Sequence, residues 1–160
     1  MTGLYCFGQR HEYVAFDSFR IDGVLKFMTS KSSLVKFLGP KSAIKNIVPE
    51  CDHEVDYTNG VKFYTYSNNG VVYLVYNNQA EFWELDLAKN PQRFLLYKQH
   101  KLSKTTTRAE LKAMFPKAFQ EFLKEKSKIL RLRLGAAFDD ELQLEIRSGK
   151  VSKVYYWTPC

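Results

Sequence analysis

Cysteine is scarce in this chain, and its cysteines form no recognisable pair. Cys6, Cys51 and Cys160 are an odd set without a CxxC spacing. A disulfide framework is therefore not expected, and reduced thiols in the cytosol fit best; one disulfide plus a free thiol stays open. At 160 residues the chain can bury a core without a disulfide or metal to staple it.

Long apolar runs and a leader segment are also missing. No stretch reaches the ~18 apolar residues of a membrane span. Residues 1–20 lack a basic segment followed by an apolar one, so no signal peptide is visible. We expect a cytoplasmic protein without a membrane span, or a periplasmic or envelope protein if a targeting segment has been trimmed from this sequence.

The motifs of common catalytic sites are absent as well. The sequence has no GxSxG, P-loop or GxGxxG pattern. Its three histidines, one of them His53, stand in no HxxH or HExxH spacing. Cys51 and His53 with the acids of 52–56 supply too few convergent ligands for a metal, and no orienting group supports a Cys–His nucleophile. The acidic run 139–141 is typical of a solvated turn. We expect no enzyme and no cofactor.

Aromatic side chains and positive charge are what the chain has in excess. It has ten Tyr and twelve Phe, and such rings favour strands and interfaces. The net charge is +7 and unevenly placed: residues 1–80 hold eight Lys or Arg against seven acids, and residues 81–160 hold sixteen against ten. A basic half indicates an acidic partner; a merely solvated cationic surface is the alternative.

Local signals predict a helix and a sheet in the first half. Thr29-Ser30 cap a helix through about Leu38, which Gly39-Pro40 ends. A second short helix is expected around Ala43–Val48. The preceding segment 13–28 reads as extended. Further strands are expected at 61–66, 71–76 and 80–87, with Asn69-Gly70 in the first hairpin turn.

The second half repeats this order of elements. Thr105–Thr107 cap a helix through Phe115 that Pro116 ends, and another helix follows at 118–126. Strands are expected at 94–102, 129–134, 142–146 and 151–157. Leu34 and Leu111 are 77 residues apart, and Gly70 and Gly149 are 79 apart. We predict an α+β fold of two pseudo-repeats, 1–90 and 91–160, each with short helices packed on an antiparallel sheet.

Strand alternation predicts which side chains face outward. With Trp83, Leu85 and Leu87 inward, Phe82, Glu84 and Asp86 lie outward; with Leu130, Leu132 and Leu134 inward, Arg131 and Arg133 lie outward. Val151 and Val154 fall on opposite faces of the last strand, which a bulge or an edge position would reconcile. The predicted partner-binding residues are Tyr76, Phe82, Glu84, Asp86, Arg131, Arg133, Lys153, Tyr155 and Trp157.

One segment carries a resemblance to known proteins. Residues 28–40, MTSKSSLVKFLGP, are similar to the G-M-T-x-x-x-V-x-x-x-L-G-x-P helix of small outer-membrane lipoproteins of the SmpA/OmlA type. With its terminal hairpin, the unit also resembles the repeat of the β-lactamase inhibitor protein fold. The second copy departs by ending in Met-Phe-Pro, and no lipobox is visible. The resemblance implies a tandem fold whose sheets form one curved, protein-gripping surface.

The predicted function is a non-enzymatic protein-binding inhibitor. Its specific form is the immunity protein of a bacterial toxin, and its partner is a toxin or enzyme with an acidic surface. One alternative is an envelope or assembly protein like the small lipoproteins, which requires an upstream targeting segment. Another is a nucleic-acid-binding module whose sheet neutralises phosphates with its basic side chains and stacks bases on its rings, carried by Arg131, Arg133, Lys153, Tyr155 and Trp157. The sequence lacks an RNP-type signature, so a protein partner is favoured.

Overall fold

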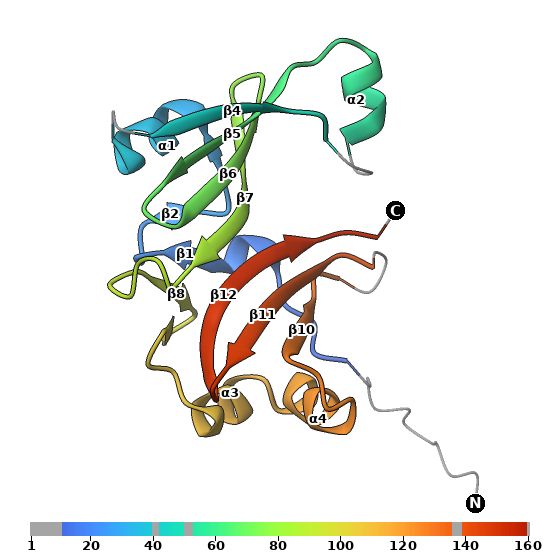
Figure 1. Cartoon of the computed structure of the whole chain (residues 1–160). Helices are drawn as coiled ribbons and strands as arrows, with labels where there is room; N and C mark the ends of the chain where they lie inside the picture. Colours follow the sequence, from blue (N-terminus) through green and yellow to red (C-terminus); the bar gives the residue numbers. More distant parts are fainter. Residues whose placement is uncertain (1–10, 40–41, 50–52, 136–138, 160) are drawn as a thin grey trace, which may run out of the picture.

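The computed structural model describes residues 11–39, 42–49, 53–135 and 139–159. A 3₁₀ turn at Phe16–Ser18 comes first in the described chain (Figure 1). The helices after it are α1 (Lys31–Leu38), α2 (Glu54–Thr58), α3 (Arg108–Met114) and α4 (Pro116–Lys124). The strands are β1 (Phe19–Ile21), β2 (Leu25–Lys26), β3 (Met28–Ser30), β4 (Ala43–Ile47), β5 (Phe63–Asn68), β6 (Val71–Tyr76), β7 (Gln79–Asp86), β8 (Phe94–Tyr97), β9 (His100–Ser103), β10 (Ile129–Arg133), β11 (Glu141–Arg147) and β12 (Lys150–Trp157). The predicted α+β class with antiparallel sheets is confirmed.

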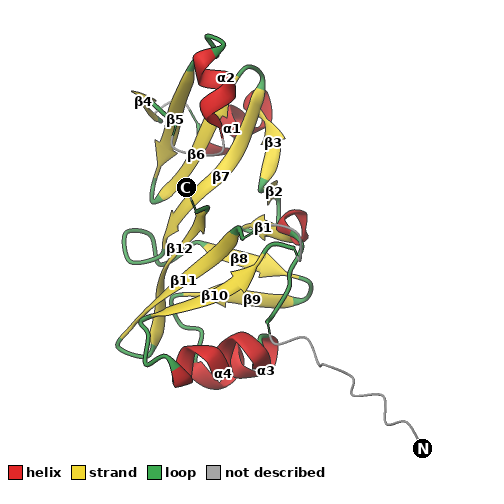
Figure 2. Ribbon diagram, turned by 90° about the vertical axis from the view of Figure 1, so that its right-hand side faces the viewer, coloured by secondary structure: helices red, strands yellow, loops and turns green. Residues whose placement is uncertain are grey.

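The strands form a large sheet and a small one. The large sheet has the order β10-β11-β12-β7-β6-β5-β4, and the small sheet has the order β2-β1-β8-β9. Figure 2 shows α3 and α4 together at one end of the molecule, with α1 and α2 at the other. Both sheets combine strands from before and after residue 90, because β1 pairs with β8 and β7 pairs with β12. The predicted ranges 1–90 and 91–160 therefore share both sheets.

Strand β7 connects the two ends of the large sheet. One edge of β7 pairs with β6 along most of its length. Its other edge changes partner: Gln79–Glu81 pair with β3, and Glu84–Asp86 pair with β12. At the change of partner, the Phe82 amide donates to the Phe27 carbonyl at 2.8 Å.

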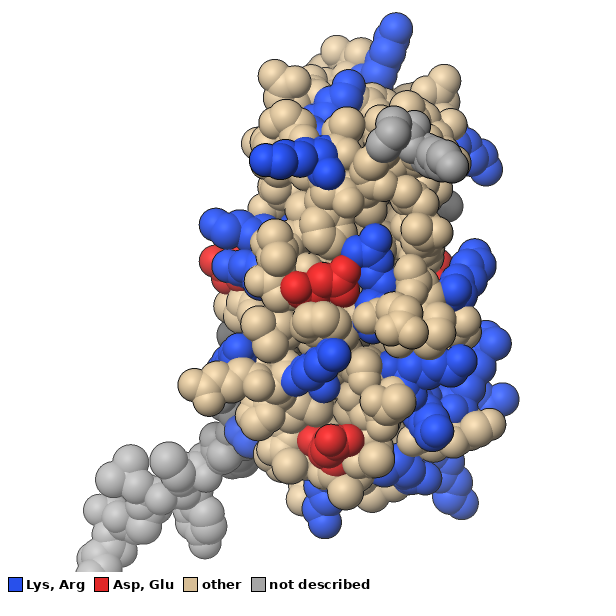
Figure 3. Space-filling view, turned by 90° about the vertical axis from the view of Figure 1, so that its left-hand side faces the viewer, with Lys and Arg blue, Asp and Glu red and all other residues tan. Residues whose placement is uncertain are grey.

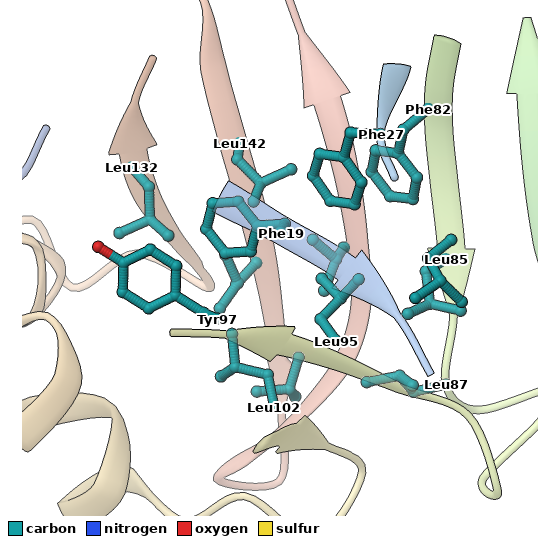
Figure 4. Packing of buried hydrophobic residues seen from close by; sticks show 14 of the residues in the cluster. Phe19, Phe27, Phe82, Leu85, Leu87, Leu95, Tyr97, Leu102, Leu132 and Leu142 are labelled. Atoms are coloured by element: carbon teal, nitrogen blue, oxygen red, sulfur yellow. The ribbon is translucent and has the colours of Figure 1, made fainter. Parts of the chain in front are cut away.

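The core lies between the large and the small sheet and is built on a run of stacked rings (Figure 4). Phe27 stacks on Phe82 with ring centroids 4.0 Å apart, and Phe19 stacks on Phe27 at 5.3 Å. Tyr97 extends the run from Phe19 at 4.7 Å and contacts Phe115 at 5.2 Å. Each buried ring contributes about 1.5–3 kcal/mol of transfer free energy. Much of the chain's aromatic content therefore serves the core.

The two predicted helix starts are confirmed with their capping residues. At α1 the Ser30 hydroxyl accepts from the Ser33 amide at 3.1 Å. At α3, Thr107 and Glu110 form a reciprocal capping box. Gly39 ends α1 at a φ of 82°, a left-handed conformation that a residue without Cβ adopts at little cost. Pro116 both follows α3 and occupies the first turn of α4, where its missing N–H is not needed.

The second short helix expected around Ala43–Val48 is wrong. Ala43–Ile47 form β4, which pairs antiparallel with β5 from Ala43–Ser67 to Ile47–Phe63. The helix of this region lies later, at α2. Spacing alone favoured a helix, because its apolar residues lie three and four apart; pairing with the edge of β5 decides the conformation instead.

The bulge suggested for the last strand is confirmed. The β11–β12 register pairs Glu145 with Lys153 but Ile146 with Val151, so Ser152 is the extra residue of β12. One extra residue shifts the alternation by one position. Val151 and Val154 are consequently both fully buried.

The two ends of the large sheet differ in how their edges are covered. The outer edge of β10 is met by the segment that precedes the 3₁₀ turn: the Val14 amide donates to the Arg133 carbonyl at 2.9 Å, and the Arg133 amide donates to the Glu12 carbonyl at 3.0 Å. At the other end, β4 is the last strand in the order, and no described residue pairs with its outer edge.

Candidate functional site

The side of the large sheet that points away from the small sheet carries most of the predicted partner-binding residues. We call this surface the outer face and define it by Glu84, Asp86, Arg131, Arg133, Glu141, Gln143, Glu145, Lys153, Tyr155 and Trp157. These side chains come from β7, β10, β11 and β12. Leu130, Leu132, Leu142 and Leu144 alternate with them and are buried toward the core, which is the alternation predicted for β10.

Cross-strand pairing arranges the outer face in rows. Arg133, Glu141 and Trp157 form one row; Arg131, Gln143, Tyr155 and Glu84 form the next; Glu145, Lys153 and Asp86 form the third. Directly opposed side chains on one sheet face lie about 4.5–5.5 Å apart at Cβ. The fold therefore brings seven of the nine predicted residues together on this face: Glu84, Asp86, Arg131, Arg133, Lys153, Tyr155 and Trp157.

Ion pairs balance the charge of the outer face. The Lys153 ammonium lies 3.2 Å from Glu84, and the Arg131 guanidinium lies 3.1 Å from Glu125 and 3.6 Å from Glu141. The Glu141 carboxylate is buried and also accepts from the side-chain amide of Gln143 at 2.7 Å. These two cations of the face are thus paired with acids from the sheet and from the end of α4. The face therefore offers a partner a pattern of paired charges.

Tyr155 and Trp157 are the aromatic side chains of this face. Trp157 is 41% exposed at the end of β12, and Tyr155 is half-buried at the centre of the middle row. Burial raises the pKa of the Tyr155 hydroxyl, with Glu145 adding to the rise, so the hydroxyl keeps its proton at neutral pH and can donate. Tyr155 also lines an open hollow with Glu84, Lys128, Ile129, Glu145 and Lys153.

Two of the nine predicted residues, Phe82 and Tyr76, lie elsewhere, and Asp86 is almost entirely buried. Phe82 is fully buried in the ring stack, so its predicted outward position is wrong. Asp86 stands opposite Lys153 on the outer face, but it is only 8% exposed and accepts from the Ala88 and Lys89 backbone amides at 3.0 Å, which makes it a turn-capping residue. Tyr76 lies toward the end of β6 that is remote from this face and contacts His53.

A bulge explains the error at Phe82. The β6–β7 register pairs Tyr73 with Phe82 and Val72 with Glu84, which leaves Trp83 as an extra residue. Phe82 and Leu85 therefore both face the core, whereas strict alternation separates them. The bulge lies where β7 changes partner from β3 to β12, and a bulge commonly accompanies such a bend.

Sequence reasoning missed several members of the outer face. Gln143 and Glu145 lie between the buried residues Leu142, Leu144 and Ile146 of β11. The period-2 rule that selected Arg131 and Arg133 applies equally to this strand and identifies both. Lys128, which lines the hollow beside the outer face, lies just before β10, where alternation within a strand cannot place it.

His53 belongs to a separate cluster beside α2. Its Nε2 lies 3.2 Å from Glu81 Oε2, and its ring contacts Phe63 and Tyr76 at 5.1 and 4.7 Å. The Tyr76 hydroxyl donates to the same Glu81 oxygen at 3.4 Å. Cys51 and Asp52, which the sequence pattern does not favour as metal ligands or a nucleophile with His53, lie outside the described residues.

The acidic run at 139–141 forms hydrogen bonds and an ion pair at the outer face. Asp140 accepts from the Thr158 hydroxyl at 2.8 Å, and Asp139 lies 3.6 Å from the Arg133 guanidinium. Glu141 is the buried partner of Gln143. The run therefore holds the end of β12 against the start of β11, next to Trp157.

Comparison of the chain with family models, curated proteins and solved structures finds no match. Within the described ranges, no three His, Cys, Asp or Glu side chains gather in the manner of a metal site. None of the described helices combines the length and the apolar character that a membrane crossing requires.

Proposed function

We propose that this chain is a non-enzymatic protein-binding inhibitor, such as the immunity protein of a bacterial toxin, and that it covers its partner with the outer face. The observation that carries the proposal is the placement of Tyr155 and Trp157 among the ion pairs of Lys153, Glu84 and Arg131 on one open sheet surface. Tyr, Trp and Arg are the residues that dominate binding energy at protein interfaces.

The shape of the surface supports a macromolecular partner. The hollow that Tyr155 lines is open to solvent, whereas small-molecule sites enclose most of the ligand surface. A sheet surface with aromatic anchors inside a polar surround matches the anatomy of protein interfaces.

We also propose that the fold arose by duplication. Each half contains a capped helix followed by a three-stranded antiparallel meander, β5-β6-β7 or β10-β11-β12. The last strands of the two meanders pair antiparallel, and Leu34 of α1 and Leu111 of α3 are both fully buried. The glycine landmarks do not correspond, because Gly70 joins β5 to β6 and Gly149 joins β11 to β12.

The experiment is capture of a partner encoded beside this gene, with loss of the partner's toxicity on co-expression. Trp157→Ala should weaken partner binding by at least tenfold, since an interface anchor contributes about 2 kcal/mol or more. Tyr57→Ala is the matched control, because Tyr57 and Trp157 are both 41% exposed and Tyr57 lies in α2, away from the outer face.

Equal affinities of Trp157→Ala, Tyr57→Ala and the unmodified chain would remove the outer face from the interface. Arg131→Glu is a poor probe, because it sets a third carboxylate against Glu125 and Glu141 and would damage the fold. Arg133→Gln removes a positive charge with less effect on the fold, because the only ion pair of Arg133 among the described residues is with the exposed Asp139.

A further inference from the structure

The positive charge of the molecule is concentrated at the end that holds α3 and α4. Residues 104–128 contain seven Lys or Arg and three Glu, and residues 145–150 add two cations and one Glu. Together these segments carry a net +5 of the chain's +7. We call their surface the basic end.

The fold brings these two segments together. A Cβ placed on Gly149, in the β11–β12 turn, would lie 3.9 Å from Arg108 Cδ at the start of α3. The Arg108 guanidinium lies over the rings of Phe119 and Phe122 at 5.8 and 5.6 Å, which ties α3 to α4. The Ile146 amide donates to the Lys128 carbonyl at 2.7 Å, so the residues after α4 adjoin the same hairpin.

The acids of the basic end are already engaged. Glu110 closes the α3 capping box, which lowers its pKa through the Thr107 amide. Glu121 lies 2.7 Å from His11, Glu125 lies 3.1 Å from Arg131, and Glu145 lies 2.8 Å from Arg147. No ion pair within the described chain engages the remaining exposed cations of this end: Lys104, Arg108, Lys112, Lys117, Lys124, Lys126, Lys128 and Lys150. Figure 3 shows Lys and Arg gathered toward the lower right of its view.

The basic end is continuous with the outer face. Lys128 lines the hollow that also contains Tyr155, Lys153 and Glu84. Lys128 and Glu145 are neighbours across the β10–β11 ladder, since Glu145 pairs with Ile129. A protein seated on Tyr155 would therefore extend over the first cations of the basic end.

We propose that the basic end binds an acidic surface of the protein partner that occupies the outer face. This inference rests on the proposed function and adds the location of the charge recognition, which sequence reasoning placed on Arg131 and Arg133. A protein is favoured over nucleic acid because the rings of this end, Phe115, Phe119 and Phe122, are buried and offer no base a stacking surface. Uncompensated lysines supply a field that attracts an acidic partner and raises its association rate.

The test compares two triple variants of equal net charge. Lys104→Glu, Lys112→Glu and Lys150→Glu reverse exposed cations of the basic end. Lys36→Glu, Lys45→Glu and Lys62→Glu reverse exposed cations elsewhere. Each triple variant lowers the chain's +7 by six charges, so the two differ only in where the charge is removed. Folding is checked by circular dichroism before binding is measured.

The probe is fluorescein-labelled poly-L-glutamate, measured by fluorescence anisotropy at low and at near-physiological salt. The basic-end variant should bind at least about tenfold more weakly than the unmodified chain, and the control variant within about threefold. Salt should weaken binding of the unmodified chain, because exposed charges are screened over about 8–10 Å. Equal losses in both triple variants would overturn the proposal.

Two further arms separate the partner classes and the two proposals. A 20-base-pair DNA duplex that binds the basic end more tightly than polyglutamate, at equal charge, would assign the end to nucleic acid instead. Trp157→Ala should leave polyglutamate binding unchanged. If Trp157→Ala abolishes partner capture while the basic-end variant captures the partner normally, the proposed function stands and this inference fails. If the basic-end variant loses the partner while Trp157→Ala captures it normally, the outer face is not part of the interface and the basic end remains the binding surface.

Discussion

Phe82 shows how one residue decides between a binding surface and a core. Its ring lies between Phe27, at 4.0 Å and nearly parallel, and Tyr73, at 5.9 Å and edge-on. The Tyr73 hydroxyl donates to the Lys26 carbonyl at 2.8 Å, so the stack also fixes the strand connection before β3. Aromatic pairs in such geometries contribute about 0.5–1.5 kcal/mol each beyond the burial of area.

Replacing this ring tests its place in the core. Phe82→Ala should lower the free energy of unfolding by about 3–5 kcal/mol, because it leaves a cavity that the surrounding rings cannot close. The measurement is urea denaturation followed by circular dichroism. Trp157→Ala, at a 41% exposed position, should cost less than about 1 kcal/mol. A loss at Phe82 no larger than that at Trp157 would contradict the buried stack.

Alternation in a strand predicts a side chain's face only while the strand is regular. It places Arg131, Leu132 and Arg133 correctly, because β10 and β11 pair without interruption. It fails at Phe82 because the bulge at Trp83 depends on β7 changing partner, a tertiary event without a local signal. In β12 the pattern itself revealed the irregularity, since Val151 and Val154 could not both be buried in a regular strand.

At the scale of elements, local chemistry predicts helix ends and tight turns better than strand pairing. The helix caps at Ser30 and Thr107 and the tight turn at Asn69-Gly70 depend on contacts within a few residues, and all of these predictions are confirmed. Strand β4 was missed because its conformation depends on β5, which lies about twenty residues later. Alternation within a strand is also local and predicts most residues of the outer face, whereas the ion pairs of that face depend on the register between strands.

Helix α2 adjoins the sheet through a small polar cluster that alkaline pH should weaken. Burial raises the pKa of Tyr76 to about 12, and the nearby Glu81 carboxylate adds to the rise. Below the ordinary tyrosine pKa of about 10, the hydroxyl is protonated in the folded and the unfolded chain, and its contribution is complete. Between pH 10 and 12 the unfolded chain releases the proton first, so stability falls as pH rises.

Tyr76→Phe should therefore flatten this alkaline loss. The free energy of unfolding of the unmodified chain should approach or cross that of Tyr76→Phe between pH 9 and pH 12, in urea titrations at each pH. Tyr57→Phe, at an exposed position in α2, serves as the control and should follow the unmodified chain. Parallel curves for all three proteins would show that the Tyr76 hydroxyl is not protected by the fold.

At the scale of the whole molecule, the large sheet is continuous, and its two edges differ in whether another segment pairs with them. Strand β7 joins its halves, and the core forms a single cluster across the predicted boundary at residue 90. The edge at β10 is paired with the chain's own residues 12–14. The edge at β4 carries exposed apolar side chains, with Ile44 at 59% exposure, and uncovered edges are where sheets add strands.

Hydrogen exchange measures this difference directly. The amides of β4 that point away from β5 should exchange at least about a hundredfold faster than the Arg133 amide of β10, because the outer edge of β4 has no partner among the described residues. The Arg133 amide is held by the Glu12 carbonyl at 3.0 Å and serves as the internal reference. Exchange in β4 as slow as at Arg133 would mean that something covers this edge in solution. Slowing that grows with protein concentration would identify the cover as a second copy of the chain, against the mutual repulsion of two molecules that each carry a net charge of +7.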